Sequence, residues 1–242
     1  MVIKTMEWAS TDPLIDNFDY FKVSMMVFQE EIKKIDLLQK EGMASSVQWS
    51  RRFEYPWAAM KVLESTEVRP LPCYGERCLD AGGGNAGFQF FLTNIYKDVY
   101  NADWFDEGIL ELEELKPLAG KGYPNLHFIH GYLPKLPFPD EYFDDSFCIS
   151  VMEHIADVDI MKSINELLRV TKKRVMITMD VEDNEGSVSY RNFRRTMNEL
   201  QIPMPPVKNP LVRDVPPFGF IRVACLYFDK RKDENESSAA LQ

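Results

Sequence analysis

A short glycine-rich stretch, residues 79–87 (LDAGGGNAG), has the residue types that bind a nucleotide-like ligand. Gly82, Gly84 and Gly87 match G-x-G-x-x-G, a pattern that occurs between a strand and a helix where the backbone closely approaches a ligand. Glycine suits such a turn because it adopts positive φ angles and has no Cβ to collide with the ligand. Apolar residues before the stretch, and apolar residues at helical spacing after it, predict this strand–turn–helix context.

Two carboxylates narrow the kind of ligand. Asp103 follows the next predicted strand, where it can accept hydrogen bonds from both ribose hydroxyls of a nucleoside, and Trp104 beside it can stack on the base. Asp80 immediately precedes the glycines. A carboxylate there repels a pyrophosphate but suits a ligand that carries an ammonium and a sulfonium. An NAD-dependent oxidoreductase is therefore the less favoured enzyme class.

Three stretches, in their order along the chain, resemble the class I S-adenosylmethionine-dependent methyltransferases: residues 79–87, 101–109 (NADWFDEGI) and 133–155 (LPKLPFPDEYFDDSFCISVMEHI). The resemblance covers residues 75–180 and implies a Rossmann-like fold with S-adenosyl-L-methionine as the cofactor. It implies that the first stretch lies near the methionine part of the cofactor and the second near its ribose and adenine. The residues that it implies in cofactor binding are Asp80, Ala81, Gly82, Gly83, Gly84, Asp103, Trp104, Tyr132, Leu133 and Ser150.

Two positions depart from the family pattern. Gly131 and Tyr132 stand where Gly-Asp usually precedes L-P-F, so Tyr132 is expected to stack or bond near the adenine in place of a carboxylate. Some family members hold a metal with E-x-x-E-H at the end of the fourth strand. Here Ser150 replaces the first carboxylate of that pattern, so no metal is predicted.

Methyl transfer is an in-line displacement, so the protein must mainly align the acceptor with the methyl group and exclude water. An oxygen acceptor or a protonated amine also needs a base. His154 is the first candidate because the unperturbed pKa of histidine is nearest neutrality, and Glu153 is the second. Alternatively, both side chains only support the end of the strand. A further alternative is a non-catalytic partner subunit that binds S-adenosylmethionine.

The acceptor pocket is expected to be built by the N-terminal segment and by an insert over residues 183–219. Aromatic and arginine side chains there can close over a flat ring or a carboxylate. Several arginines on a chain of net charge -10 favour a small acidic or sugar-like acceptor, methylated on O or N. For any single arginine, an ion pair with a surface carboxylate is the simpler explanation. The predicted acceptor contacts are Trp49, Arg52, Tyr55, Trp57, Tyr190 and Arg194.

The elements that must position these residues alternate between short apolar strands and helices. This pattern predicts an α/β fold, a doubly wound, mostly parallel seven-stranded sheet with helices on both faces. Ligands bind such sheets outside the carboxyl ends of the strands, where the strand order reverses. The expected strands are residues 77–81, 99–103, 126–130, 146–150, 174–179 and 221–228. The expected helices are residues 85–96, 105–118, 157–170 and 190–200.

The sequence predicts three regions. Residues 1–72 form an N-terminal helical cover, with a helical period over residues 14–41 and a second helix that has Pro56 in its first turn. This cover is expected to serve as packing, as a lid, or as a homodimer surface. Residues 73–230 form the methyltransferase domain. Residues 231–242 are polar and expected to be disordered.

Composition excludes some partners. The net charge of -10 disfavours nucleic acid, which needs a basic face. No apolar run approaches the roughly 20 residues of a membrane span, and no secretory signal is recognised at the start. The four cysteines form no C-x-x-C pair, and Cys78, Cys148 and Cys225 lie in apolar runs. Buried free thiols predict a reducing cytoplasm.

Overall fold

The computed structural model describes residues 2–8, 51–63, 75–84, 86–104, 122–182, 188–206, 212–214 and 220–231. The predicted helices over residues 14–41 and 105–118, the residue Trp49 and the tail from residue 232 lie outside these ranges.

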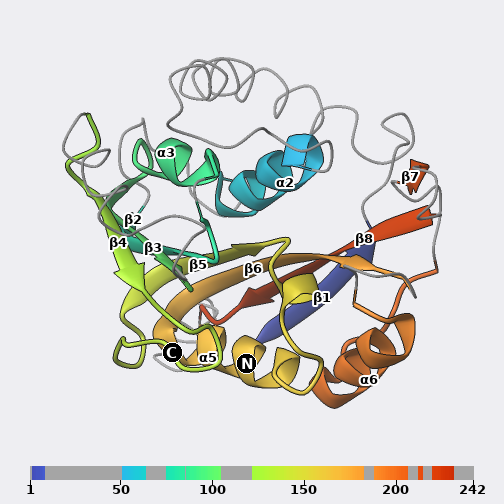
Figure 1. Ribbon diagram of the computed structural model, residues 1–242. Helices are drawn as coiled ribbons and strands as arrows, with labels where there is room; N and C mark the ends of the chain where they lie inside the picture. The colour runs from blue at the N-terminus through green and yellow to red at the C-terminus, as the bar shows by residue number, and fades with distance from the viewer. Residues whose placement is uncertain are drawn as a thin grey trace, which may run out of the picture.

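Seven strands form one continuous sheet in the order β1-β8-β6-β5-β2-β3-β4, and a short strand, β7, pairs with β8 (Figure 1). Strands β2 to β6 are parallel, whereas β8 is antiparallel to both β6 and β1. The order reverses between β2 and β5, so the predicted doubly wound, mostly parallel sheet is confirmed. The strands are β1 (Ile3–Trp8), β2 (Gly75–Ala81), β3 (Tyr96–Asp103), β4 (Leu126–His130), β5 (Phe143–Ile149), β6 (Thr171–Val181), β7 (Val212–Asp214) and β8 (Phe220–Asp229).

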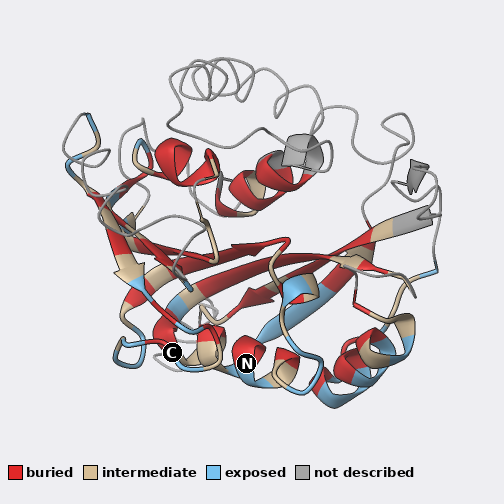
Figure 2. Ribbon diagram, in the orientation of Figure 1, coloured by how far each residue is buried: buried red, intermediate tan, exposed pale blue. Residues whose placement is uncertain are grey.

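Helices cover both faces of the sheet. Figure 1 shows α2 (Arg51–Leu63) and α3 (Phe88–Leu92) on one face, and α5 (Ile160–Val170) and α6 (Tyr190–Leu200) on the other. Because side chains alternate along a strand, Met176 of β6 packs with the α2 and α3 side, and its neighbour Ile177 packs with the α5 and α6 side. The strands between the two layers are accordingly buried, as Figure 2 shows.

Two helix predictions are wrong in detail. The helix after the glycine loop, expected over residues 85–96, is only the five residues of α3. Thr93 and Asn94 end it, because their side chains donate to the carbonyls of Phe90 and Phe91 at 2.6 and 3.2 Å. Pro56 is the sixth residue of α2 rather than a residue of its first turn.

The strand β1 was not predicted. Its six residues pair with β8 from Ile3 opposite Asp229 to Trp8 opposite Ala224. Met6 and Trp8 are buried, and the Trp8 ring lies 5.5 Å from the ring of Phe193 on α6. The start of the chain therefore belongs to the sheet itself.

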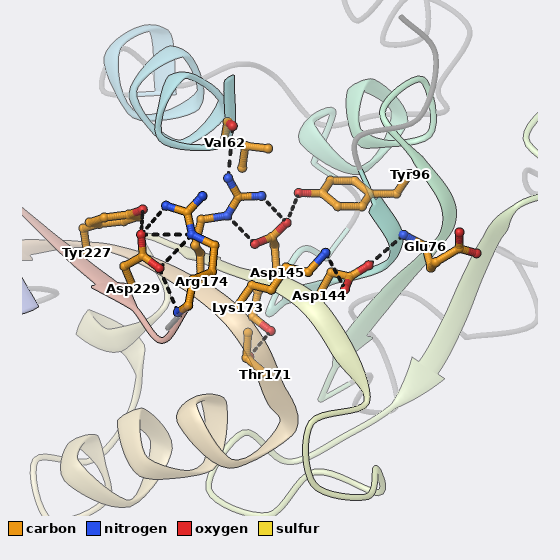
Figure 3. A network of polar contacts seen from close by, with 12 residues as sticks. Val62, Glu76, Tyr96, Asp144, Asp145, Thr171, Lys173, Arg174, Tyr227 and Asp229 are labelled. Carbon is orange, nitrogen blue, oxygen red and sulfur yellow. Dashed lines mark hydrogen bonds and ion pairs between the residues drawn. The ribbon is translucent and has the colours of Figure 1, made fainter. Parts of the chain in front are cut away.

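A buried ion pair fixes α2 to the sheet at the amino end of β6 (Figure 3). The guanidinium of Arg174 donates from Nε and Nη2 to the two carboxylate oxygens of Asp145 at 2.6 and 2.7 Å. Tyr96 donates to the same carboxylate at 2.7 Å. Arg174 Nη1 donates to the carbonyl of Val62, near the end of α2, at 3.0 Å. This network lies at the opposite edge of the sheet from the carboxyl ends of the strands.

The structure confirms that Cys78, Cys148 and Cys225 are buried free thiols. Burial raises the pKa of all three thiols, so they remain protonated and unreactive at neutral pH. Within the described ranges, no helix is both long enough and apolar enough to cross a bilayer.

Candidate cofactor and acceptor site

The glycine loop follows β2 at the point where the strand order reverses. Gly82 and Gly84 have φ angles of +74° and +51°, which favour glycine. A Cβ on Gly83 would lie 2.5 Å from Oδ2 of Asp80, a residue that is only 2% exposed. The predicted glycines are thus required by the backbone angles at two positions and by the close approach of a carboxylate at the third.

Asp103 ends β3 beside this loop. Its Oδ2 accepts a hydrogen bond from the backbone N–H of Gly84 at 2.7 Å. Burial raises the pKa of the Asp103 carboxyl, although the backbone N–H groups of Gly84 and Trp104 act in the opposite direction. The structure therefore brings the two halves of the predicted cofactor site, the glycines and the second carboxylate, into direct contact.

Two buried amide side chains that the sequence analysis did not single out support the loop. Asn101, two residues before Asp103 on β3, donates to the carbonyl of Gly84 at 2.6 Å and to Oε1 of Gln89 at 2.5 Å. Gln89 on α3 donates to the carbonyl of Ala86 at 2.9 Å. An alternating strand that ends in Asp103 places Asn101 on the same face, so this spacing was the available signal.

Two aromatic residues, Trp104 and Tyr132, follow the ends of β3 and β4 near Asp103. Trp104 is 54% exposed and Tyr132 is 46% exposed, and their rings meet edge to face at 5.4 Å. The Tyr132 hydroxyl donates to Asp159 at 3.1 Å, and this hydrogen bond raises the pKa of Tyr132. Leu133 beside them is buried. This group has the exposed aromatic surface that the adenine role predicted for Trp104 and Tyr132 requires.

The end of β5 has an unusual backbone. Ser150 is buried and has a φ of +49°, a conformation that costs a residue other than glycine about 1–3 kcal/mol. Its hydroxyl donates to Oε1 of Glu54 on α2 at 2.5 Å. Its backbone N–H donates to the carbonyl and hydroxyl oxygens of Thr178 on β6, at 3.0 and 3.1 Å. Two elements, α2 and β6, therefore hold this strained serine at the carboxyl edge.

The turn after Ser150 lies against the glycine loop. A Cβ on Gly82 would be 2.6 Å from both γ-carbons of Val151. A 3-10 helix, η1 (Met152–His154), follows and carries the two candidate bases. Met152 is buried, Glu153 is partly buried and His154 is exposed. The structure thus places Glu153 and His154 at the same sheet edge as the glycine loop, and their role as bases stays a prediction.

The predicted acceptor contacts fall into separate places. Tyr55 and Trp57 of α2 are buried in the core, where Tyr55 stacks on Phe88 at 4.7 Å. Arg52 lies in α2, and its side chain is outside the described part of the structure. Tyr190 and Arg194 lie on α6, beside a surface hollow of about 450 Å³. The structure brings Tyr190 and Arg194 to one hollow but places Tyr55 and Trp57 elsewhere, and the role of all these residues stays a prediction.

Part of the chain is similar in sequence to known methyltransferases. Residues 79–179 match the family model of the methyltransferase domain. The chain is 35% identical over 102 residues to the demethylmenaquinone methyltransferase of Geobacillus kaustophilus (strain HTA426). It is 32% identical over 104 residues to the ubiquinone/menaquinone biosynthesis C-methyltransferase UbiE of Vibrio campbellii (strain ATCC BAA-1116). Each match covers 40% of this chain and spans 42% and 38%, respectively, of the two relatives.

Among solved structures, the fold is similar to that of the Burkholderia thailandensis 1,6-didemethyltoxoflavin-N1-methyltransferase, determined with 1,6-didemethyltoxoflavin and S-adenosylhomocysteine bound. The TM-score is 0.53 at 15% identity, and the alignment covers 93% of this chain and 96% of that one. The fold, the site and the matched segment support the class I S-adenosylmethionine-dependent methyltransferase family, of which residues 79–179 match the methyltransferase domain. The cofactor of this family is S-adenosyl-L-methionine.

Proposed function

We propose that this protein is an enzyme that transfers a methyl group from S-adenosylmethionine to a small organic molecule at the carboxyl edge of its sheet. The observation that supports this proposal is the contact between Asp103 and the glycine loop where the strand order reverses. A carboxylate and a glycine turn in this arrangement suit the ribose and the amino-acid end of one ligand.

The chemistry of the site fits this cofactor better than NAD. Asp80 is buried directly under Gly83, and Asp103 lies beside Gly84. Two carboxylates against one loop oppose a pyrophosphate but favour a ligand that carries an ammonium and a sulfonium. When bound, the cofactor supplies a methyl group on a positively charged sulfur.

The residues of the chain then have three tasks. Asp103 would accept the ribose hydroxyls, and Trp104 with Tyr132 would pack on the adenine. The turn that carries Val151 would close the other side of the glycine loop and exclude water from the reacting atoms. Glu153 or His154 on η1 would remove the proton of the acceptor.

Two classes of acceptor are consistent with these tasks. One relative is named a demethylmenaquinone methyltransferase and the other a ubiquinone/menaquinone biosynthesis C-methyltransferase, which favours methylation of a carbon on a quinone-like ring. The α6 surface favours the acidic or sugar-like acceptor methylated on O or N. Among the described residues, Arg191 and Arg194 form no ion pair, and both line the hollow on α6. A ring hydroxyl, a sugar hydroxyl and a protonated amine would each need a base to remove a proton, whereas an ionised carboxylate acceptor would not.

Calorimetry with S-adenosylmethionine, S-adenosylhomocysteine and NAD tests the cofactor. We expect saturable binding of the first two compounds, and saturable binding of NAD alone would overturn the proposal. Transfer of a labelled methyl group to a panel of demethylmenaquinol, hydroxy acids and amino sugars then tests the acceptor. Binding of the cofactor without transfer to any compound would favour a non-catalytic partner subunit.

A further inference from the structure

One buried charge near the carboxyl edge has no role in the proposed function. The side chain of Glu54 on α2 is 0% exposed. Burial removes the hydration of a carboxylate, so donors in the core must replace the lost water. Two hydroxyls do so here. Ser150 Oγ and Thr178 Oγ1 both donate to Glu54 Oε1, at 2.5 and 2.6 Å.

These contacts form a closed ring. Thr178 Oγ1, which donates to Glu54, also accepts the backbone N–H of Ser150 at 3.1 Å. Ser150 is thereby fixed at its hydroxyl and at its backbone, with φ at +49°. A serine keeps this conformation only where its surroundings hold it, and the ring provides that restraint.

The position of Glu54 is itself fixed by the other end of its helix. Val62, eight residues later on α2, accepts a hydrogen bond from Arg174, four residues before Thr178 on β6 (Figure 3). Eight helical residues span about 12 Å, and four strand residues span about 13 Å. The two spans agree, so α2 lies antiparallel along β6 with both contacts made at once.

The ring is connected to the cofactor site through one residue. Val151 follows Ser150 directly and occupies the space beside Gly82 in the glycine loop. A change at Ser150 therefore changes how Val151 supports that loop. We propose that Glu54 is a positioning residue for cofactor binding, which holds the turn after β5 against the glycine loop through Ser150. The inference rests on the proposed function, since it takes the glycine loop to bind the amino-acid end of the cofactor.

A purely structural role for Glu54 makes a different prediction. In that case, replacing Glu54 would lower the stability of the protein, but the molecules that remain folded would bind the cofactor normally. The distinguishing measurement is therefore the dissociation constant of S-adenosylhomocysteine by calorimetry on the full chain, at a temperature where thermal unfolding shows each variant to be folded.

We expect Glu54→Ala to weaken the binding of S-adenosylhomocysteine by about tenfold, on the scale of hydrogen bonds to a charged group. Thr178→Val, which removes one hydroxyl from the ring at nearly constant volume, is expected to weaken binding in the same direction. Thr178→Ser keeps the hydroxyl and should bind within about twofold of the original protein, as rescue by the conservative variant requires. If Glu54→Ala does not fold, the affinities of Thr178→Val and Thr178→Ser for S-adenosylhomocysteine test the inference in its place.

Tyr96→Phe is the matched control for stability. It removes a buried hydroxyl from the Asp145 network at the opposite edge of the sheet. It should therefore lower the melting temperature without weakening the binding of S-adenosylhomocysteine. Equal affinity in the original protein and in Thr178→Val would overturn the inference alone. Absence of S-adenosylhomocysteine binding by the original protein would overturn the proposed function and the inference together.

Discussion

The carboxylate of Asp103 and the backbone N–H of Gly84 are joined by a hydrogen bond of 2.7 Å, so the end of β3 directly fixes the glycine loop. Asp103→Ala removes both this support and the proposed ribose contact. We expect S-adenosylhomocysteine binding to weaken by about 1–3 kcal/mol, measured by calorimetry. Asp98→Ala, on the same strand but paired with His127, is the control and should bind normally. Unchanged affinity in Asp103→Ala would remove the ribose assignment.

The raised pKa of Asp103 predicts a dependence of cofactor affinity on pH. Ribose hydroxyls donate to the ionised carboxylate, so full affinity is expected above the pKa of Asp103, and affinity is lost as the pH falls through it. Because burial raises this pKa, the loss should begin above the pH at which an ordinary aspartate titrates, about 3.9. Calorimetry over a pH series should show this step in the original protein. In Asp103→Asn the step should be absent, and its persistence there would assign it to another group.

Local sequence signals were sufficient to predict the strands and the glycine loop at the centre of the sheet. The glycine loop and Asp103 lie within 25 residues of one another, and their spacing after two apolar strands predicted that both lie at the carboxyl edge proposed to bind the cofactor. Helix α6 was predicted with its observed bounds because its apolar residues, Phe193, Met197 and Leu200, recur at helical spacing and all are buried.

The contacts that were missed join residues far apart in the chain. Glu54 meets Ser150 across 96 positions and Thr178 across 124. Nothing in the sequence near Glu54 distinguishes it from a solvent-exposed glutamate on an amphipathic helix. Strand β1 was missed for a similar reason. Its residues, IKTMEW, have only two buried side chains, and the strand exists because β8 offers a free edge.

Gly82 and Gly84 provide a matched pair for the glycine loop. Both have positive φ, but a Cβ on Gly82 would lie 2.6 Å from Val151. A Cβ on Gly84 would meet, among the described residues, only Asp103, at 3.5 Å. We expect Gly84→Ala to lower the free energy of unfolding by about 1 kcal/mol from backbone strain alone, and Gly82→Ala to lower it by about 2–4 kcal/mol. Denaturant unfolding measures both values. Val151→Ala should recover part of the loss in Gly82→Ala, and equal losses in the two single variants would refute the packing argument.

His154 on η1 is expected to act on the acceptor rather than on the cofactor. If it is the base, His154→Ala should lower kcat by about 100-fold or more, on the scale of general base catalysis, with little change in S-adenosylhomocysteine affinity. The measurement uses the first acceptor that the panel identifies. Glu153→Gln is the parallel test, because Glu153 is the other candidate on the same turn. If His154→Ala is fully active, His154 is a structural residue, and Glu153 becomes the remaining candidate for the base.

The buried pair of Arg174 and Asp145 should dominate the stability of the sheet at its amino edge. Arg174→Met leaves the Asp145 carboxylate buried with only the Tyr96 hydroxyl from this network, and it removes the hydrogen bond to the Val62 carbonyl. We expect a loss of about 3–5 kcal/mol in the free energy of unfolding. Arg169→Met is the control, since Arg169 is partly exposed and its ion pairs with Asp140 and Glu166 should contribute at most about 1 kcal/mol.

The double variant Arg174→Met/Asp145→Leu separates the two sources of that loss. It removes the buried charge together with its partner, so most of the stability should return if the unpaired carboxylate is the cause. The bond to the Val62 carbonyl and the bond from the Tyr96 hydroxyl to Asp145 would then remain broken, and each should account for about 1–2 kcal/mol. A double variant as unstable as Arg174→Met would instead show that the hydrogen bonds of this network, and not the unpaired Asp145 carboxylate, account for the loss.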